Sequence, residues 1–336
     1  MVSFGLSMGI SSREPISRLP ALVNRAENLG FDAFYVLDSQ VILKDAYIGL
    51  AIAAQSTNKI MLGTGVTNPV TRDLSVITTA FSAIQELSDG RAILGIGNGA
   101  TAVDPISLSP ASLSQMEKSI RLLTGLLAGE EVIYRGKPIR ILAAGNPVPI
   151  FLSASQPKML KLAGKIADGV ILMGSSTPSL VAHQINIIKD GANEAGRDIK
   201  NIFIDLWQTI SVSDNKHQAF NDVKSWVASQ SKYWLQKVSD LPPEVVDAVN
   251  GDELFQASEN YKVDQHLSLK AKHKDFVSDE MADLMAIAGD SEYCSKKLSA
   301  LASLGVNQIT LTLLSGGRED RLNTLAEVIK SVKVLE

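Results

Sequence analysis

Two glycine-rich turns contain residues suited to holding a flat ligand. Residues 95–100 read GIGNGA and residues 63–69 read GTGVTNP, and each turn follows an apolar run. Glycine permits unusual backbone geometry and lets a ligand approach the main chain closely. We expect residues 95–100 to be a loop at the end of a strand. Residues 63–69 predict a bulge whose backbone supports a planar ring, and a plain loop is the alternative.

Residues 95–100 also match the dinucleotide fingerprint G-x-G-x-x-G/A. That fingerprint works only where a helix opens directly behind the glycines and binds the pyrophosphate at its N-terminus. Residues 101–110 contain Pro105 and Pro110, so we expect no helix to open there. The sequence therefore disfavours a dinucleotide-binding fold.

Two further positions are suited to chemistry. Residues 153–158 read SASQPK. Small residues followed by a proline and a lysine suit an anion at a helix N-terminus, although an ordinary helix cap has the same sequence.

Asp38 follows another apolar run. A carboxylate at the carboxyl end of a barrel strand is placed to act on substrate or cofactor, and a loop ion pair is the alternative.

Strand-sized apolar runs alternate with helical patterns along the whole chain. Such runs are typical of a parallel sheet that is buried on both faces. The expected strands are 3–8, 33–37, 59–64, 92–97, 149–153, 169–173, 201–211 and 308–313. The expected helices are 16–29, 45–57, 75–87, 112–128, 158–167, 179–195, 292–304 and 321–332. Eight strands, each followed by a helix, predict an α/β fold of the (β/α)8 TIM-barrel type.

Short glycine turns join several helices to the following strands. They contain Gly30, Gly90, Gly169 and Gly305. Glycine after a helix adopts the left-handed conformation without a steric cost, so we expect all four to do so. Repeated short connections at one end of the sheet support the barrel.

Two segments interrupt the alternation. Residues 130–142 alternate apolar and polar around a central glycine, which predicts an added β-hairpin. Residues 214–290 are polar and predict a mostly helical insertion near the barrel mouth, after strand seven. Without this insertion of roughly 75 residues the chain has about the length of one barrel. We therefore expect residues 1–336 to form a single domain.

Composition limits the classes of function. The chain has 336 residues and a net charge of −4, which provides no basic surface for nucleic acid or an anionic membrane. It has one cysteine, Cys294, and four histidines, so we expect no disulfide and no metal site. The first residues show neither a basic stretch nor a long apolar run, so we expect no signal peptide, and no apolar run nears the ~20 residues of a membrane span; both favour a cytoplasmic protein.

The glycine turns resemble those of the bacterial luciferase-like flavin and deazaflavin oxidoreductases. Residues 62–69, 86–99 and 162–170 carry the resemblance. Within that superfamily the chain is most similar to the F420-dependent methylenetetrahydromethanopterin reductases. The resemblance covers almost the whole chain except residues 214–290.

This resemblance implies a cofactor at the carboxyl ends of the barrel strands, and usually a homodimer. It also implies a non-prolyl cis peptide bond at Gly65–Val66, against the face of the cofactor ring. The family's ring and phosphate contacts map onto Asp38, Asn68, Asn98, Gly99, Ala154, Ser155 and Lys158. Arg72 or Lys161 would meet an anionic cofactor tail.

The chain departs from the family at three positions that often carry ionisable groups. It has Ser7, Ser39 and Ala100 where related enzymes have Glu, His and Glu. General acid–base catalysis needs an ionisable group within reach of the reacting atoms. Asp38 remains as the catalytic candidate.

The resemblance predicts an oxidoreductase that passes a hydride between C5 of coenzyme F420 and a small organic substrate. An FMN-dependent monooxygenase or reductase of the same fold is the alternative, because both cofactors use the same backbone cradle. The three uncharged positions leave a third hypothesis open, a protein that binds a flavin or deazaflavin without catalysis.

Overall fold

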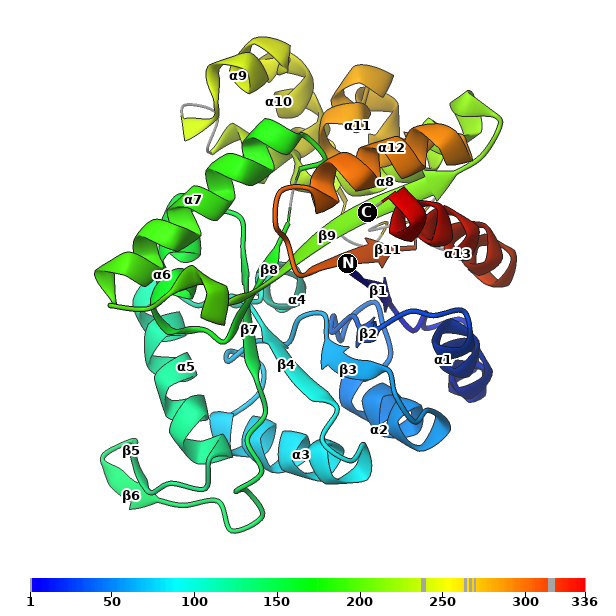
Figure 1. The fold of residues 1–336 in the computed structure, drawn as a ribbon. Coiled ribbons are helices and arrows are strands. Elements are labelled where there is room, and N and C mark those ends of the chain that lie inside the picture. Colours follow the sequence, from blue (N-terminus) through cyan, green and yellow to red (C-terminus); the bar gives the residue numbers. More distant parts are fainter. Residues whose placement is uncertain are drawn as a thin grey trace.

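Eight parallel strands form a closed barrel with helices outside it (Figure 1). The structure is a computed structural model that describes residues 2–173, 175–236, 240–262, 265, 268, 270–313 and 318–335. The strands are β1 (Ser3–Met8), β2 (Ala33–Val36), β3 (Met61–Thr64), β4 (Ala92–Ile96), β7 (Ile150–Ala154), β8 (Gly169–Leu172), β9 (Phe203–Val212) and β11 (Gln308–Thr312). Pairing of β8 with β9 closes the ring, with Gly169 opposite Phe203. All eight predicted strands are confirmed.

A helix follows each barrel strand, as predicted. These helices are α1 (Leu19–Asn28), α2 (Ala46–Ser56), α3 (Leu74–Leu87), α5 (Leu113–Leu127), α6 (Pro157–Ile166), α7 (Pro178–Glu194), α12 (Ser291–Ala302) and α13 (Arg318–Leu335). Local sequence fixes several of their starts. The carboxylates of Asp45 and Asp73 accept backbone N–H bonds at the starts of α2 and α3, and Ser112 forms a capping box with Gln115 on α5.

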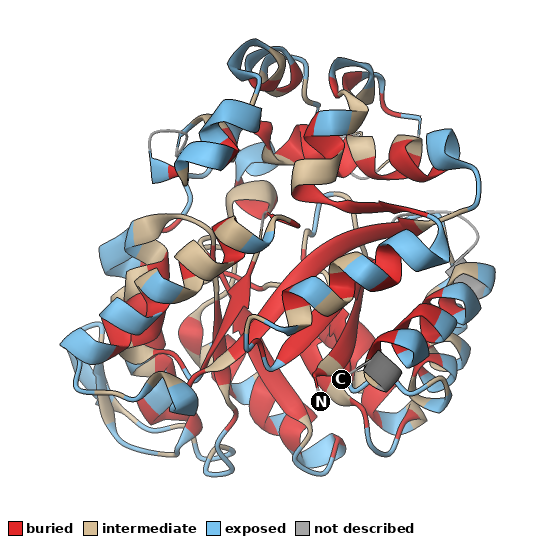
Figure 2. Ribbon diagram, turned by 45° about the horizontal axis from the view of Figure 1, so that its top comes forward, coloured by how far each residue is buried: buried red, intermediate tan, exposed pale blue. Residues whose placement is uncertain are grey.

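The strands are buried on both faces (Figure 2). Alternate strand residues point into the barrel, where Tyr35, Phe151, Ile171 and Trp207 pack together. The intervening residues point outward and form the larger core beneath the helices. The barrel interior is therefore filled by side chains, and space for a ligand lies only at an end of it.

The two segments that interrupt the alternation form the predicted kinds of structure. Residues 130–142 contain the hairpin of β5 (Val132–Tyr134) and β6 (Lys137–Ile139). The 214–290 segment contains α8 (Lys216–Leu235), α9 (Pro243–Ala248), α10 (Gly251–Glu259) and α11 (Asp279–Met285). It also contains a short strand that was not predicted, β10 (Ile287–Gly289), which pairs in parallel with β9.

Two local predictions are wrong. A single helical turn, α4 (Ala100–Val103), opens directly behind Gly99, because Gly99 caps it and four residues fit before Pro105. Gly30, Gly90 and Gly305 have the expected positive φ angles, but Gly169 does not. Gly169 is the first residue of β8, and a Cβ there would lie 2.5 Å from the Phe151 ring. A close contact inside the barrel, rather than a left-handed turn, therefore requires this glycine.

Within the described ranges, no helix has the length and apolar character needed to cross a membrane. In the same part of the chain, no cluster of three or more His, Cys, Asp or Glu side chains is arranged to hold a metal ion.

Candidate functional site

A cavity of about 280 Å³ lies where the carboxyl ends of seven barrel strands meet α8. Enzymes of the barrel class carry their active sites at this end. The described residues that line the cavity are Leu37, Asp38, Ser39, Leu43, Gly65, Val66, Gly97, Asn98, Gly99, Ala100, Thr101, Ala102, Ser153, Ala154, Ser155, Gln156, Met159, Met173, Trp207, Trp226, Gln230, Tyr233 and Thr312.

Seven of the nine predicted site residues line this cavity. They are Asp38, Gly65, Val66, Asn98, Gly99, Ala154 and Ser155. The peptide bond Gly65–Val66 is cis, as predicted. The structure thus brings the turns after β3, β4 and β7 together with the end of β2 around one space.

Asn68 and Lys158 lie outside the cavity wall. Asn68 is fully buried behind Gly99, and its Oδ1 accepts bonds from the backbone N–H groups of Val70 and Thr71. Its Nδ2 has no hydrogen-bond partner. Lys158 has an exposed side chain on the first turn of α6. The sequence predicted the loops that contain both residues, but it did not predict that their side chains lie outside the cavity.

Backbone forms one wall of the cavity because larger residues do not fit there. A Cβ on Gly65 would lie 2.6 Å from Cη2 of Trp207, and one on Gly97 would lie 2.8 Å from Cγ2 of Val66. Gly99 has a φ of 87° and would push a Cβ against Asn68. A wall of this kind fits the face of a flat ring, which needs close approach to the main chain.

Asp38 is the one carboxylate among the described residues of the cavity wall. Its side chain is 4% exposed, and Oδ2 lies 3.5 Å from Nε of Arg72 without a well-formed hydrogen bond. Arg72 bonds Asp45 more closely, at 2.8 Å, and its guanidinium lies 4.1 Å from the centre of the Tyr47 ring. Asp38 therefore forms a loose ion pair with Arg72, and its Oδ2 is buried without a formed hydrogen bond.

The residues expected to meet an anionic cofactor tail are engaged elsewhere. Arg72 is occupied by Asp45 and Asp38, and Lys161 pairs with Glu194 on α7. Neither lines the cavity.

The three departures from the family pattern leave the cavity with few titratable groups. Ser39 and Ala100 line it, and the buried Ser7 hydroxyl lies 2.7 Å from that of Thr312. The titratable side chains among the described lining residues are Asp38 and Tyr233. Burial, with a further contribution from Asp104, raises the pKa of Tyr233. Tyr233 therefore remains protonated at neutral pH and can donate a hydrogen bond.

Sequence reasoning missed the aromatic side of the cavity. Trp207 enters it from β9, while Trp226, Gln230 and Tyr233 reach it from α8. Gln156 Nε2 donates to the carbonyl of Tyr233 at 3.0 Å and so attaches α8 to the turn after β7. Alternation along β9 places Trp207 on the inner face, but nothing in the α8 sequence indicates which side chains face the barrel.

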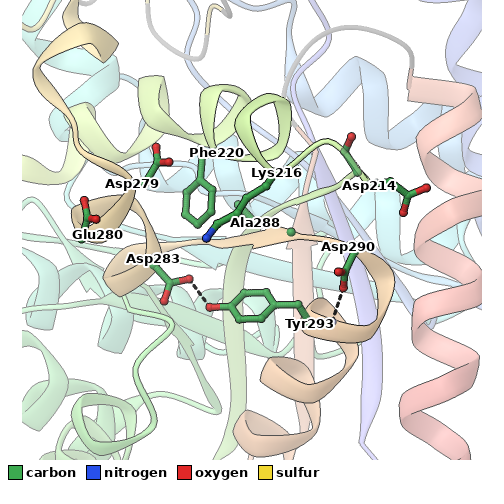
Figure 3. Close-up of a pocket in the computed structure, with 11 residues that line it drawn as sticks. Asp214, Lys216, Phe220, Asp279, Glu280, Asp283, Ala288, Asp290 and Tyr293 are labelled. Carbon is green, nitrogen blue, oxygen red and sulfur yellow. Dashed lines mark hydrogen bonds between the residues drawn. The ribbon is translucent and has the colours of Figure 1, made fainter.

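A second cavity, of about 440 Å³, lies between α8, α11 and the start of α12 (Figure 3). It is rich in carboxylates, but several of them already have partners. Asp279 pairs with Lys224, Asp283 pairs with Lys297 and accepts from the Tyr293 hydroxyl, and Asp290 caps α12. These contacts hold the helices together, so the smaller cavity is the better candidate site.

Comparison with known protein families and sequences gives matches over most of the chain. A family model described as luciferase-like monooxygenase matches residues 1–308. A 5,10-methylenetetrahydromethanopterin reductase from Methanolobus tindarius is 31% identical over 92% of this chain and 93% of its own length. An F420-dependent glucose-6-phosphate dehydrogenase from Nakamurella multipartita is 29% identical over 68% of this chain and 73% of its own length.

Solved structures share the fold. The coenzyme F420-dependent tetrahydromethanopterin reductase from Methanopyrus kandleri has a TM-score of 0.81 and 23% identity, with 97% of each chain covered. An F420-dependent secondary alcohol dehydrogenase has a TM-score of 0.78 and 20% identity, with 98% of this chain and 99% of that one covered. Both similarities support the (β/α)8 barrel.

Proposed function

The chain belongs to the luciferase-like monooxygenase family, and on that premise we propose that it is an oxidoreductase that uses coenzyme F420. The observation that carries this proposal is the cavity wall of backbone at Gly65, Gly97 and Gly99, in a cavity that aromatic side chains also line. A flat deazaflavin ring fits such a wall. Of the relatives compared above, the glucose-6-phosphate dehydrogenase and the Methanopyrus kandleri reductase are F420-dependent by name.

Coenzyme F420, when bound, supplies a hydride donor or acceptor at C5 of its ring. The protein supplies position and electrostatics. Gly65, Val66 and Gly97 would hold the ring face, and Trp207 would pack beside it. Asp38 would hold or move the proton that accompanies a hydride in most reductions.

We propose 5,10-methylenetetrahydromethanopterin as the first substrate to test. The curated relative with 31% identity over most of both chains carries that name. Trp226 and Tyr233 offer apolar, aromatic surface for a flat substrate ring.

A paired titration of the purified protein with F420 and with FMN, followed by fluorescence, tests the cofactor. We expect F420 to bind at micromolar concentration or tighter, and FMN at least about tenfold more weakly, a difference of about 1.4 kcal/mol. Preferential binding of FMN would contradict the proposal and would favour the flavin-dependent monooxygenases or reductases of the same fold. Tight binding of F420 without turnover would instead favour a binding protein.

We also propose that the protein is a homodimer through α2 and α3. These helices are neighbours on the barrel surface, and α2 contains no charged residue. Ile48 and Val76 are 57% and 55% exposed on them. A helix that is apolar all round is usually buried, so a second copy of the same surface would cover these side chains.

Lysine at both exposed positions tests this interface. We expect the double variant Ile48→Lys, Val76→Lys to have the monomer mass in light scattering, because two charges on each copy would have to be buried. Val246→Lys, an exposed apolar position on α9, is the matched control and should keep the dimer mass. A monomeric wild-type protein, or a double variant that stays dimeric, would disprove the interface.

A further inference from the structure

A buried carboxylate lies next to the aromatic side of the cavity but does not line it. Asp205 is on β9, two residues before Trp207, and both point into the barrel. Asp205 is 0% exposed. Taking an ionised carboxylate out of water is costly unless hydrogen bonds compensate, so each of its contacts is informative.

Several donors surround Asp205. Trp207 Nε1 donates to Oδ2 at 3.0 Å, and Gln308 Nε2 donates to the same oxygen at 2.9 Å. Thr310 donates through its hydroxyl to Oδ1 at 2.7 Å, and Gln308 Nε2 also donates to the Tyr35 hydroxyl at 3.4 Å. Burial raises the pKa of Asp205 to about 6, and these hydrogen bonds oppose the rise. The carboxylate is thus held on both oxygens.

The Trp207 indole connects this carboxylate to the cavity. Its N–H end bonds Asp205, while Cη2 on the benzene ring is the atom nearest to a Cβ built on Gly65, at 2.6 Å. The Tyr35 ring lies at 5.0 Å from the indole and is tilted by 59° to it. An indole with one hydrogen-bonded edge has a fixed ring plane, whereas packing alone leaves the plane freer to tilt.

We propose that Asp205 is a positioning residue that acts through Trp207. The hydrogen bond fixes the plane of the indole next to Gly65–Val66, and that plane sets where the cofactor ring lies relative to the substrate. This inference rests on the proposed function, because it assumes that the ring occupies this cavity. Catalytic rate depends steeply on such placement, and errors of about 1 Å cost up to 10²-fold.

The alternative is a purely structural network that joins β2, β9 and β11 inside the barrel. Four variants separate the two roles. Asp205→Leu removes the acceptor, and Trp207→Phe removes the indole N–H but keeps an aromatic ring. Asp205→Asn keeps an acceptor oxygen for Trp207, and Thr310→Val removes a different donor while leaving the Asp205–Trp207 bond intact.

Turnover with reduced F420 and methylenetetrahydromethanopterin is the first readout. We expect kcat to fall about tenfold or more in Asp205→Leu and in Trp207→Phe, and to stay within about threefold in Asp205→Asn. The kcat of the double variant Asp205→Leu, Trp207→Phe should be no lower than that of the slower single variant, because both substitutions remove the same contact. Thr310→Val should lower Tm without a matching loss of kcat. An equal loss of kcat in Thr310→Val, or unchanged kcat in Trp207→Phe, would overturn the proposal.

A second readout does not need the cofactor. The protein contains three tryptophans, so 5-fluorotryptophan labelling gives a simple fluorine NMR spectrum, and Trp207→Phe assigns the relevant resonance. We expect one sharp Trp207 resonance in cofactor-free wild type and Asp205→Asn, and a broadened or split one in Asp205→Leu. An unchanged resonance in Asp205→Leu would disprove the positioning role. If wild type fails to bind F420, the proposed function fails, while this spectrum still decides whether Asp205 orients Trp207.

Discussion

Replacing Asp38 by asparagine is expected to lower kcat about 10²- to 10⁴-fold, the usual contribution of a general acid or base. Asp38 is the one carboxylate among the described lining residues, and its Oδ2 has no hydrogen-bond partner in the protein. Asparagine has nearly the same shape but cannot take up a proton. The measurement is kcat for reduced F420 with methylenetetrahydromethanopterin.

The fold should tolerate this change, which makes the loss interpretable. Arg72 keeps its closer partner Asp45 at 2.8 Å when Asp38 becomes neutral. We therefore expect Tm to change by only a few degrees, about what 1 kcal/mol produces. Asp247→Asn, an exposed carboxylate on α9, is the matched control and should leave kcat unchanged. A kcat within threefold of wild type in Asp38→Asn would remove Asp38 from any acid–base role.

Replacing Gly97 by valine is expected to weaken F420 binding by about 100-fold, which corresponds to about 2.7 kcal/mol. A Cβ at this position would lie 2.8 Å from Val66 Cγ2 and 3.4 Å from Ser153 Cβ, both on the cavity wall. The two valine methyl groups would add to this crowding and displace residues that line a space of about 280 Å³. Fluorescence titration with F420 measures the loss.

Two further variants, a smaller substitution and a control, test this prediction more sharply. Gly97→Ala adds only the Cβ, so we expect an intermediate loss of affinity. Gly251→Val is the control, because a Cβ on Gly251 meets nothing within 4 Å and this residue lies at the start of α10. Wild-type affinity in Gly97→Val, with its far-UV circular dichroism unchanged, would place the cofactor elsewhere.

The sequence predicted the barrel because local patterns encode it. Continuous apolar runs identify buried parallel strands, and helix periodicity with caps such as Asp45 and Ser112 identifies the helices. Loops at strand ends of a barrel meet at one face, so the sequence alone assigns the turns containing Gly65, Asn98 and Ser155 to one site.

The positions of individual loop side chains were not predictable in this way. Asn68 and Lys158 belong to the correct turns, yet one is buried behind Gly99 and the other is exposed on α6. A side chain at a turn points where the local φ and ψ angles send it, and packing against distant residues decides those angles. The turn at Ala100 was missed for a similar reason, since Gly99 caps it in a left-handed conformation.

What the sequence alone determined is therefore the framework: the order of strands and helices, the end of the barrel that carries the site, and the family. The tertiary structure decided the contents of the site. Gln156 meets Tyr233 across 77 residues of sequence, and Asp205 meets Thr310 across 105. Local periodicity in the sequence cannot predict contacts between residues so far apart in the chain. These contacts arise only when the closed barrel and the packed α8 bring distant segments together.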